Sequence, residues 1–434
     1  MPATAMRVLV TGASGFIGHA VAHALRQRGH RVVRGLRHPP PGATDTLLVD
    51  FAMVPRREWW LPRLKDIDVV VNAVGILREQ RGQNFRGLHS DAPGELFHAC
   101  AAAGVGTVVQ VSALGADGDA RSAYHLSKRA ADDVLRTLPL RGAVVQPSLV
   151  YGPGGTSAAL FNKLAVAPLL PFPEGGRMQV QPVHIADLVA GIVRVVEQPP
   201  PAIETLVFAG PQPIALAAYL SQLRHGLGEA GRLRMLPLPA SLFRLGASLA
   251  AHLPGSMLDR ETADMLLAGN ATQHNALPSL LGRAPRPPEN FIAPETREAT
   301  RRMAVLDLWT PVLRAALAFL WIWTAIVSFG LYPVQGSYEL LAGVGLHGRI
   351  ATFALYGAAA LDLLFGVLTL AAPARWRRWL WLAQVALIAG YTVLITVFLR
   401  QYWLHPYGPI SKNIPLLALI GLLWALEPRA PRRR

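Results

Sequence analysis

The chain has 434 residues, of which 52% are hydrophobic, and it carries a formal net charge of +15 with a single cysteine, Cys100. That length accommodates two or three domains, and one cysteine excludes an intramolecular disulfide. Cys100 lies in an Ala-rich stretch typical of a helix, so we interpret it as a small core residue. No nucleic-acid-binding motif accompanies the positive charge, much of which flanks apolar runs, so we expect a membrane and not a nucleic acid as partner.

Residues 1–150 alternate strand-like and helix-like stretches. The predicted strands are short apolar runs that begin at Met6, Arg31, Thr46, Asp68, Gly106 and Gly142. A helix is expected over 16–28, with Gly29 after its end. Strands that alternate with helices predict a doubly wound parallel α/β sheet. The N-terminus leads directly into the first strand, so no secretory leader is expected.

Residues 151–282 are less regular and predict a smaller substrate lobe over the carboxyl edge of the sheet. Helices are expected over 184–197 and near 256–268. The Pro-rich stretch from Arg283 to Pro294 predicts an extended segment, and we place a linker over 283–307.

Residues 308–427 contain four apolar segments, at 311–332, 350–372, 379–399 and 413–426, and residues 428–434 form a basic tail. A bilayer-spanning helix needs about 20 residues. The first three segments meet that length, and the fourth meets it only if it begins near Pro409. An all-α four-helix transmembrane bundle is therefore expected.

Arginines are distributed unevenly around these segments. The arginines before the first span, between the second and third spans, and after the fourth are Arg301, Arg302, Arg375, Arg377, Arg378, Arg429, Arg432, Arg433 and Arg434. The positive-inside rule then places the N-terminal domain and the C-terminus in the cytoplasm, at an inner (plasma) membrane of bacterial type. If the fourth segment does not span, the C-terminus falls outside.

The strongest local motif is TGASGFIG, from Thr11 to Gly18, between the first strand and the first helix. Glycines at a turn permit unusual backbone angles and a close approach of a pyrophosphate to the helix N-terminus, where free N–H groups favour anions. A dinucleotide is therefore expected there. The second strand ends with Arg34 and Arg37 and lacks the acid that an NAD site places near the ribose. Arginine suits a 2′-phosphate, so NADP(H) is preferred over NAD(H), with a solvated basic turn as the alternative.

Tyr124 and Lys128 are spaced to share one helix face. An ammonium beside a phenol favours the phenolate, so the pair suits acid–base chemistry at an alcohol or carbonyl. Ser112 ends a strand at the same sheet edge and is expected to bind the same substrate oxygen.

Together these motifs resemble the extended or atypical branch of the short-chain dehydrogenase/reductase superfamily, over roughly residues 6–225. Further matching stretches are Asp50–Phe51, Val71–Gly75, Pro147–Gly155 and Pro182–Val189. The resemblance implies that Tyr124 is the general acid/base, that Lys128 lowers its pKa and holds the nicotinamide ribose, and that Ser112 orients the substrate.

The implied cofactor contacts include Tyr124 and Lys128 and, along the chain, Thr11, Gly12, Ser14, Gly15, Phe16, Ile17, Gly18, Arg34, Arg37, Asp50, Phe51, Asn72, Ala73, Val74, Gly75, Pro147 and Ser148. The chain is also similar to the group that contains the nucleotide-binding accessory subunit of respiratory complex I, some members of which bind the cofactor without catalysis. His89 lies where many relatives carry Asn, and we interpret it as a packing or capping residue.

The four-segment region resembles the DoxX-like family of membrane domains, including residues 405–419. Asp362 lies near the middle of the second segment, where an acid usually faces the bundle interior. Gln384, Thr392 and Thr396 are its candidate partners, in structural packing or alternatively in a proton or ligand site. No cluster of His and Cys side chains predicts a metal site.

Two functions follow from the sequence. The first is a membrane-tethered NAD(P)(H)-dependent oxidoreductase of a carbonyl or alcohol, with a lipid or quinone-like molecule as the candidate substrate. The second is a non-catalytic NADP(H)-binding assembly or sensor subunit of a membrane complex. A membrane complex and a homo-oligomer are both candidate partners of the chain. Epimerase or dehydratase chemistry also remains open, because the same Tyr–Lys pair supports it.

Overall fold

The structure is a computed structural model that describes residues 5–80, 82–251 and 259–428. The chain divides into two compact units, Met1–Ala304 and Val305–Arg434. The expected basic tail lies almost wholly outside the described residues, as does the start of the helix expected near Ser256.

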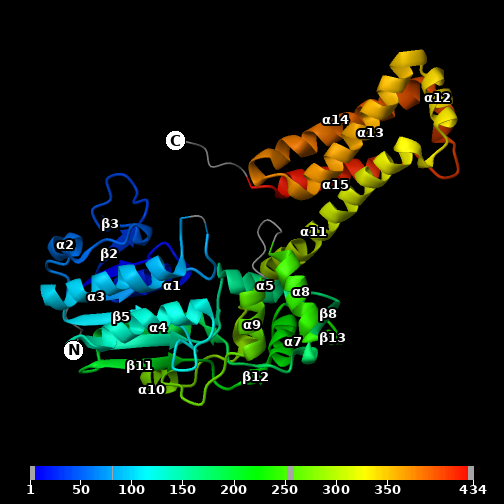
Figure 1. The fold of residues 1–434 in the computed structure, drawn as a ribbon. Helices are drawn as coiled ribbons and strands as arrows, with labels where there is room; N and C mark the ends of the chain where they lie inside the picture. Colours follow the sequence, from blue (N-terminus) through cyan, green and yellow to red (C-terminus); the bar gives the residue numbers. More distant parts are fainter. Residues whose placement is uncertain (1–4, 81, 252–258, 429–434) are drawn as a thin grey trace. The chain divides into compact units, whose positions relative to one another are not determined.

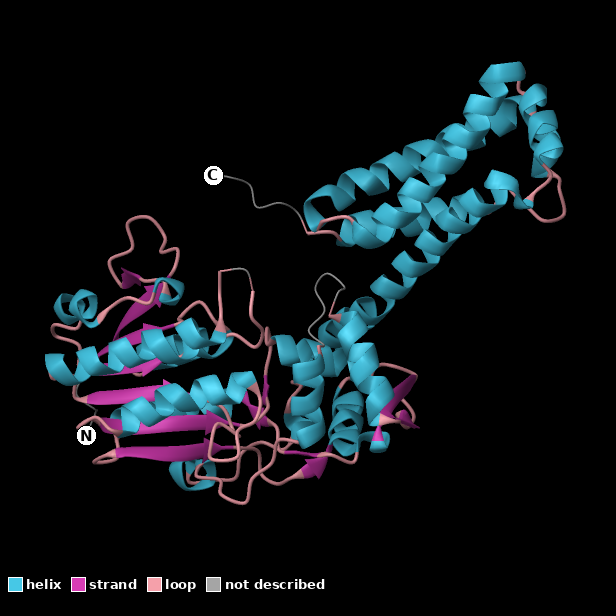
Figure 2. Cartoon of the chain, viewed as in Figure 1, coloured by secondary structure: helices cyan, strands magenta, loops and turns pink. Residues whose placement is uncertain are grey.

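The first unit is built on a seven-stranded parallel sheet with the order β11-β6-β5-β4-β1-β2-β3 (Figures 1 and 2). Its strands are β1 (Arg7–Thr11), β2 (Arg31–Leu36), β3 (Thr46–Leu48), β4 (Val69–Asn72), β5 (Thr107–Val111), β6 (Arg141–Pro147) and β11 (Ile203–Phe208). The doubly wound parallel sheet predicted from the sequence is confirmed. The seventh strand, β11, comes from the region assigned to the lobe, so the sheet extends beyond residue 150 in sequence.

Helices cover both faces of this sheet. Side chains on a strand alternate between faces, so Val8 enters the core beneath α1 (Phe16–Gln27) and α6 (Ile185–Glu197). Its neighbour Leu9 enters the opposite core, beneath α3 (Ala92–Ala103) and α4 (Ala123–Arg136). Two buried layers of apolar side chains therefore hold the carboxyl ends of the strands in fixed positions.

The lobe consists of short helices and two-stranded pairs beside this edge. Its helices are α5 (Thr156–Ala165), α7 (Leu216–Gly226), α8 (Ala240–Ala250) and α9 (Arg260–Ala268). The short helix α10 (Leu277–Leu281) packs instead against α6, in the core on one face of the main sheet. Its strand pairs are β7 (Val150–Tyr151) with β10 (Val183–His184), β9 (Gln179–Val180) with β12 (Ile214–Ala215), and β8 (Leu169–Pro173) with β13 (Arg234–Leu238). A single-turn helix, α2 (Arg57–Trp60), lies between β3 and β4.

The Pro-rich stretch that we expected to be an extended linker is packed against the first unit. Arg283 Nη2 lies 2.5 Å from Asp187 Oδ1, and Asp187 Oδ2 accepts the backbone N–H of Arg286 at 2.8 Å. Phe291 is buried and stacks on Tyr151. The fully buried Asp187 carboxylate needs these partners, so the segment is held in place and α11 (Arg297–Ile326) begins within the expected linker.

The second unit is helical. Among the described residues, three helical stretches have the length and composition to cross a membrane. They are Pro294–Leu331, which contains the whole of α11, together with α13 (Gly348–Ala371) and α14 (Ala374–Phe398). The fourth apolar segment forms α15 (Asn413–Leu426), which begins at Asn413 and not near Pro409. Its 14 residues extend about 21 Å, less than the hydrocarbon thickness of about 30 Å. A further helix, α12 (Val334–Gly343), was not expected.

Polar side chains join the helices inside this unit. Gln384 Oε1 accepts the indole N–H of Trp321 at 3.1 Å, and Gln384 Nε2 donates to Thr369 Oγ1 at 2.9 Å. Gln384 is therefore not the partner of the buried Asp362 that we had expected. The other two candidates also have partners of their own.

Thr392 Oγ1 accepts a hydrogen bond from Asn413, and Thr396 Oγ1 accepts one from Trp403. The arginines that we placed between the second and third spans lie in the first two turns of α14, because only Ala372 and Pro373 separate that helix from α13.

Candidate active site

The Thr11–Gly18 motif forms a tight cradle between β1 and α1. Gly12 has a φ of +70°, and a Cβ there would lie 2.7 Å from the carbonyl oxygen of Ala73. A Cβ on Gly18 would lie 2.2 Å from the carbonyl oxygen of Gly12. Only glycine fits these positions, and they bring the backbone to the N-terminus of α1, where a pyrophosphate binds. These residues fit a dinucleotide.

Buried polar side chains hold the neighbouring wall of the cradle. Thr11 Oγ1 donates to Asn72 Oδ1 at 2.7 Å, and Asn72 Nδ2 donates to Gln110 Oε1 at 2.7 Å. Asn72 Oδ1 also accepts the backbone N–H of Val74 at 3.3 Å. The chain Thr11–Asn72–Gln110 joins β1, β4 and β5 and fixes the Ala73–Gly75 turn beside Gly12. Gln110 was not among the predicted residues, although a single Gln in an apolar strand is a visible signal.

The two arginines after the cradle differ in their surroundings. Arg34 Nη2 lies 3.1 Å from Asp45 Oδ1, and Arg26 of α1 also forms an ion pair with Asp45. Arg37 is exposed just beyond the end of β2. Asp45 is the first acid after Gly29 in the sequence, and the fold returns it to Arg34. Arg37 is therefore the more accessible of the two side chains, and Arg34 is engaged with Asp45.

Asp50 and Phe51 shape the adjoining turn. Asp50 Oδ1 accepts the backbone N–H of Ala52 at 3.0 Å and caps a short helical turn. Phe51 is buried with its ring 5.9 Å from that of Trp60. In this structure both side chains hold the turn that follows β3.

Tyr124 and Lys128 lie in the first turns of α4, as the spacing predicted. The Lys128 ammonium donates to the carbonyl oxygens of Val74 at 3.2 Å and Val111 at 3.1 Å, at the carboxyl ends of β4 and β5. A Cβ on Gly75 would lie 3.1 Å from Lys128 Nζ, so glycine leaves room for this ammonium. Burial lowers the pKa of Lys128.

The pKa of Tyr124 departs from the expectation that Lys128 would lower it. Burial raises the pKa of Tyr124 to about 12, and the charge of Asp132 adds to the rise. The phenol is therefore protonated at neutral pH, which suits the donation of a proton more than its removal.

Ser112 is buried, and its hydroxyl donates to Asp132 Oδ2 at 2.5 Å. The side chain is thus engaged with α4. Asp132 lies four residues after Lys128 on the same helix face, and burial raises its pKa. Asp132 was not among the predicted residues, although its spacing of four residues from Lys128 places the two side chains on one helix face.

His89 links three segments of the site. Its Nε2 accepts the backbone N–H of Ile76 at 2.9 Å, and its Nδ1 lies 2.9 Å from Ser127 Oγ. The Ser127 hydroxyl in turn donates to the carbonyl oxygen of Tyr124 at 2.7 Å, so His89 Nδ1 is the donor in their contact. Burial lowers the pKa of His89 to about 2, so the ring is neutral. This geometry is that of the packing residue that we expected.

Pro147 and Ser148 end β6 beside this site. Ser148 Oγ donates to the carbonyl oxygen of Gln181 at 2.6 Å, and its backbone N–H donates to Phe208 at 2.9 Å. Ser148 thus ties the sheet edge to the lobe. Phe16 of the cradle packs close to Gly155, because a Cβ on Gly155 would lie 3.0 Å from the Phe16 ring.

A cleft of about 1090 Å³ opens between the segment before α4 and α9. Ala123 and His125, the neighbours of Tyr124, line one side, and Glu261 and Met265 line the other. Glu261 Oε1 also accepts the backbone N–H of Tyr124 at 3.0 Å. Glu261 lies far along the chain from Tyr124, and nothing in the sequence pointed to it. Among the described residues, no group of three or more His, Cys, Asp or Glu side chains gathers as metal ligands do.

The sequence pattern of the NAD dependent epimerase/dehydratase family matches residues 8–205, and that of the DoxX-like family matches residues 318–421. A Streptomyces protein described as 3-diazoavenalumate denitrifying reductase is 30% identical over 305 residues, which cover 63% of this chain and 95% of the relative. The chain belongs to the NAD dependent epimerase/dehydratase family. It joins that NAD(P)-binding domain to a DoxX-like membrane domain.

Two further relatives each match about half of the chain. Ceramide reductase of Caulobacter vibrioides (strain NA1000 / CB15N) is 29% identical over 241 residues, which cover 54% of this chain and 75% of the relative. The mitochondrial NADH dehydrogenase (ubiquinone) 1 alpha subcomplex subunit 9 of Mus musculus is 26% identical over 248 residues, and the match spans 63% of its length.

Solved structures of low sequence identity share the fold. MoeE5 in complex with UDP-glucuronic acid and NAD has a TM-score of 0.51 at 21% identity, covering 68% of this chain and 99% of that one. A nucleoside-diphosphate-sugar epimerase from Staphylococcus aureus has a TM-score of 0.52 at 16% identity, covering 66% and 99%. The epimerase/dehydratase family fold therefore extends through the lobe.

Proposed function

We propose that the chain is a membrane-anchored reductase that uses NADP(H) to convert the carbonyl of a lipid-borne substrate into an alcohol. The observation that carries the proposal is the placement of Tyr124 and Lys128 at the carboxyl edge of the sheet, beside the glycine cradle, where Ala123 and His125, the neighbours of Tyr124, line the cleft. The lipid character of the substrate rests on the membrane domain of the same chain and on the relative described as a ceramide reductase.

In the proposed reaction, NADPH supplies a hydride to the carbonyl carbon when it is bound. Tyr124 donates its phenolic proton to the carbonyl oxygen, which completes the alcohol. A pKa raised by burial keeps that proton in place until the oxygen gains charge. The Lys128 ammonium stabilises the phenolate that remains and holds the cofactor ribose.

The remaining residues position this pair. Ser112 acts through Asp132, which lies on α4 beneath Lys128, and we assign it a positioning role in place of direct contact with the substrate. His89 and Ser127 fix the first turn of α4. Glu261 fixes the same turn from the lobe, so a substrate that moves α9 would also move Tyr124.

For the cofactor, we propose a preference for NADP(H) because Arg37 is exposed at the end of β2, where a 2′-phosphate would lie. For the location, we propose an inner membrane with the soluble unit in the cytoplasm. Arg301 and Arg302 precede the first span, and three arginines lie in the first two turns of α14.

A second candidate function is a non-catalytic subunit of a membrane complex. It is favoured by the similarity to the complex I subunit. Its expected observation is copurification with such a complex and no oxidation of NADPH by any carbonyl substrate.

The test is NADPH oxidation by the full chain in nanodiscs that contain a long-chain keto-sphingoid or keto-acyl lipid. Turnover is expected in the unmodified chain and is expected to fall by about 10²–10⁴-fold in Tyr124→Phe. NADPH affinity is expected to stay unchanged in that variant. Equal turnover in the two chains would rule out the mechanism, and no turnover with retained NADPH binding would favour the second candidate.

A further inference from the structure

One arginine interrupts the first apolar segment, residues 311–332. Arg314 is the single charged residue of that segment. Its Nη2 donates to the backbone carbonyl oxygen of Thr369 at 2.8 Å, near the C-terminal end of α13. Its Nε is buried and has no hydrogen-bond partner, and no carboxylate of the described residues forms an ion pair with it. A guanidinium keeps its charge when it is buried, so Arg314 is a partly buried cation without an acid of its own.

A second arginine meets the same helix end. Arg377 of α14 donates through Nε to the backbone carbonyl oxygen of Ala372 at 3.0 Å. Thr369 and Ala372 are three residues apart, so the two carbonyl oxygens lie about one helical turn from each other. The last carbonyls of a helix lack partners within it and carry partial negative charge, which favours cations there. Arg314 and Arg377 therefore converge on the end of α13 from two different helices.

One acid serves this pair of arginines. Glu427, directly after α15, has its Oε2 3.9 Å from Arg377 Nη1, and its Oε1 accepts the indole N–H of Trp381 at 3.4 Å. The charges of Arg377 and Glu427 both act on Arg314. We define the basic cluster as Arg314, Arg377 and Glu427. Its two guanidiniums and one carboxylate leave one positive charge unbalanced within the described chain, and an unbalanced charge in a partly buried site is costly.

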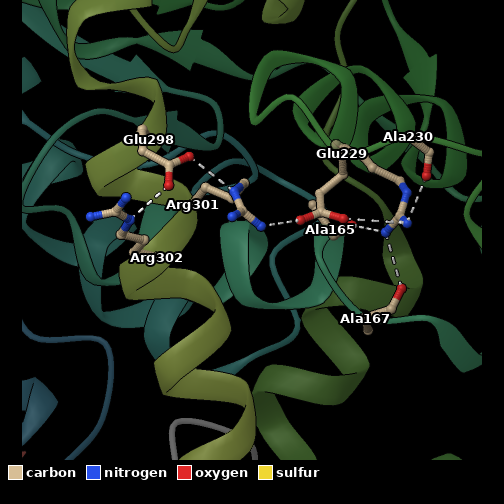
Figure 3. A network of polar contacts seen from close by, with 8 residues as sticks. Ala165, Ala167, Glu229, Ala230, Glu298, Arg301 and Arg302 are labelled. Atoms are coloured by element: carbon tan, nitrogen blue, oxygen red, sulfur yellow. Dashed lines mark hydrogen bonds and ion pairs between the residues drawn. The ribbon is translucent and has the colours of Figure 1, made fainter.

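The arginines that precede the first span have carboxylate partners. Arg301 Nη1 lies 3.0 Å from Glu229 Oε1, and Arg301 Nε lies 3.1 Å from Glu298 Oε2 (Figure 3). Arg302 Nε lies 2.6 Å from the other carboxylate oxygen of Glu298. Arg314 lacks such a partner, so the basic cluster favours an anion that comes from outside the chain.

The basic cluster lies at the end of a pair of spans. Only Ala372 and Pro373 separate α13 from α14, and a lipid-exposed turn of this kind lies outside the hydrocarbon region. Trp376 and Trp379, in the first two turns of α14, are 57% and 68% exposed. Exposed tryptophans at the end of a span are typical of the interface between lipid and water. The basic cluster is therefore at the depth of the lipid headgroups.

We propose that Arg314 and Arg377 bind the phosphate of an anionic phospholipid at the end of α13. The planar guanidinium presents pairs of N–H donors that match phosphate oxygens. Basic pockets between membrane-spanning helices suit lipid headgroups for this reason. The phosphate supplies the negative charge that the basic cluster lacks. This site goes beyond the proposed reduction and does not depend on it.

The test is native mass spectrometry of the full chain in a non-ionic detergent. The chain is titrated with phosphatidylglycerol or with phosphatidylcholine that has the same acyl chains. Arg314→Gln removes the charge but keeps an N–H donor for the carbonyl of Thr369. Arg349→Gln is the matched control, because Arg349 is exposed in the first turn of α13, at the other end of that helix. Circular dichroism verifies that each variant keeps its helices.

The unmodified chain is expected to bind phosphatidylglycerol more tightly than phosphatidylcholine. Arg314→Gln is expected to weaken phosphatidylglycerol binding by about 10-fold, because it removes a charged hydrogen bond. Arg349→Gln is expected to leave that binding unchanged. Equal weakening in the two variants would overturn the proposal, because the net charge of the chain would then explain the binding. Equal affinity for the two lipids would also overturn it.

A second variant changes the affinity in the opposite direction. Glu427→Gln keeps an acceptor for Trp381 and removes the carboxylate that competes with the phosphate. Phosphatidylglycerol is expected to bind several-fold more tightly to it, which a misfolded bundle would not produce, and unchanged or weaker binding would contradict the proposal. Inorganic phosphate is not expected to displace the lipid, because it lacks acyl chains. Displacement at equal concentration would assign the site to a free anion instead.

Discussion

The Nδ1 atom of His89 lies 2.9 Å from the Oγ atom of Ser127, and this contact joins the segment before α3 to the helix that carries Tyr124. Because the other ring nitrogen accepts the backbone N–H of Ile76, both nitrogens of the neutral ring are used. Protonation of His89 would set a new N–H of the ring against the Ile76 N–H, so two donors would face each other inside a fully buried site.

The free energy of unfolding is therefore expected to fall as the pH is lowered from 7 to 5. Burial lowers the pKa of His89 from its ordinary value to about 2, so the unfolded chain binds the proton first. The contribution of His89 is complete above pH 6.5 and decreases below it, by about 2 kcal/mol at pH 5. The measurement is chemical or thermal unfolding of the full chain at both pH values. His184, whose pKa is lowered to about 4 by burial, adds to the trend.

The control for this pH dependence is His89→Gln, which removes the titrating group. This variant is expected to be less stable at pH 7 and to lose less stability between pH 7 and 5 than the unmodified chain. An identical pH dependence in both chains would show that His89 does not titrate as described.

Gly12→Ala is expected to abolish most cofactor binding. The new Cβ would lie 2.7 Å from the carbonyl oxygen of Ala73, and the φ of +70° is unfavourable for alanine by about 1–2 kcal/mol. The measurement is NADPH fluorescence titration. Gly118→Ala is the matched control, because a Cβ there meets no atom within 4 Å. Equal loss of affinity in both variants would point to general destabilisation instead.

The charges after β2 are expected to set the choice between NADP and NAD. Arg37→Ser should weaken NADPH binding by about 10- to 100-fold, because it removes a charged hydrogen bond, and should leave NADH binding unchanged. Asp45→Asn should strengthen NADPH binding, because it releases Arg34 from its ion pair. Calorimetric titration with both cofactors measures the two effects. Parallel changes for NADPH and NADH would contradict the assignment of a 2′-phosphate site.

Gln384→Leu is expected to destabilise the helical unit by about 1–2 kcal/mol. The substitution leaves the indole N–H of Trp321 and the hydroxyl of Thr369 without the amide that joins their helices. Unfolding in detergent, followed by tryptophan fluorescence, measures the change. Leu382→Ala, at a half-exposed position on the same helix, should have a smaller effect. The reverse order would show that the buried hydrogen bonds contribute little.

The sequence predicted those parts of the first unit that depend on local pattern. Apolar runs predicted six of the seven strands, and the Gly spacing predicted the cradle at Gly12 and Gly18. The pairing of β11 with β6 was not predicted, because its residues alternate less clearly and its neighbour is distant in sequence.

The missing parts of the candidate site arise from contacts between distant segments. Asp45 forms an ion pair with Arg34, Glu261 accepts the backbone N–H of Tyr124, and Asp132 accepts the hydroxyl of Ser112. None of these contacts produces a periodic pattern in the sequence. The burial that raises the pKa of Tyr124 is likewise a property of packing and not of the Tyr–Lys spacing.

The path of the hydride separates a reductase from the other functions most directly. NADPH deuterated at the transferring position of the nicotinamide is incubated with the full chain and a keto-lipid in nanodiscs, and the product is analysed by mass spectrometry. We predict one deuterium on the carbinol carbon of the alcohol. Tyr124→Phe is expected to form this deuterated alcohol only at its low residual rate. Conversion of a substrate with the deuterium retained on the cofactor would indicate an epimerase or dehydratase and would contradict the proposed reduction.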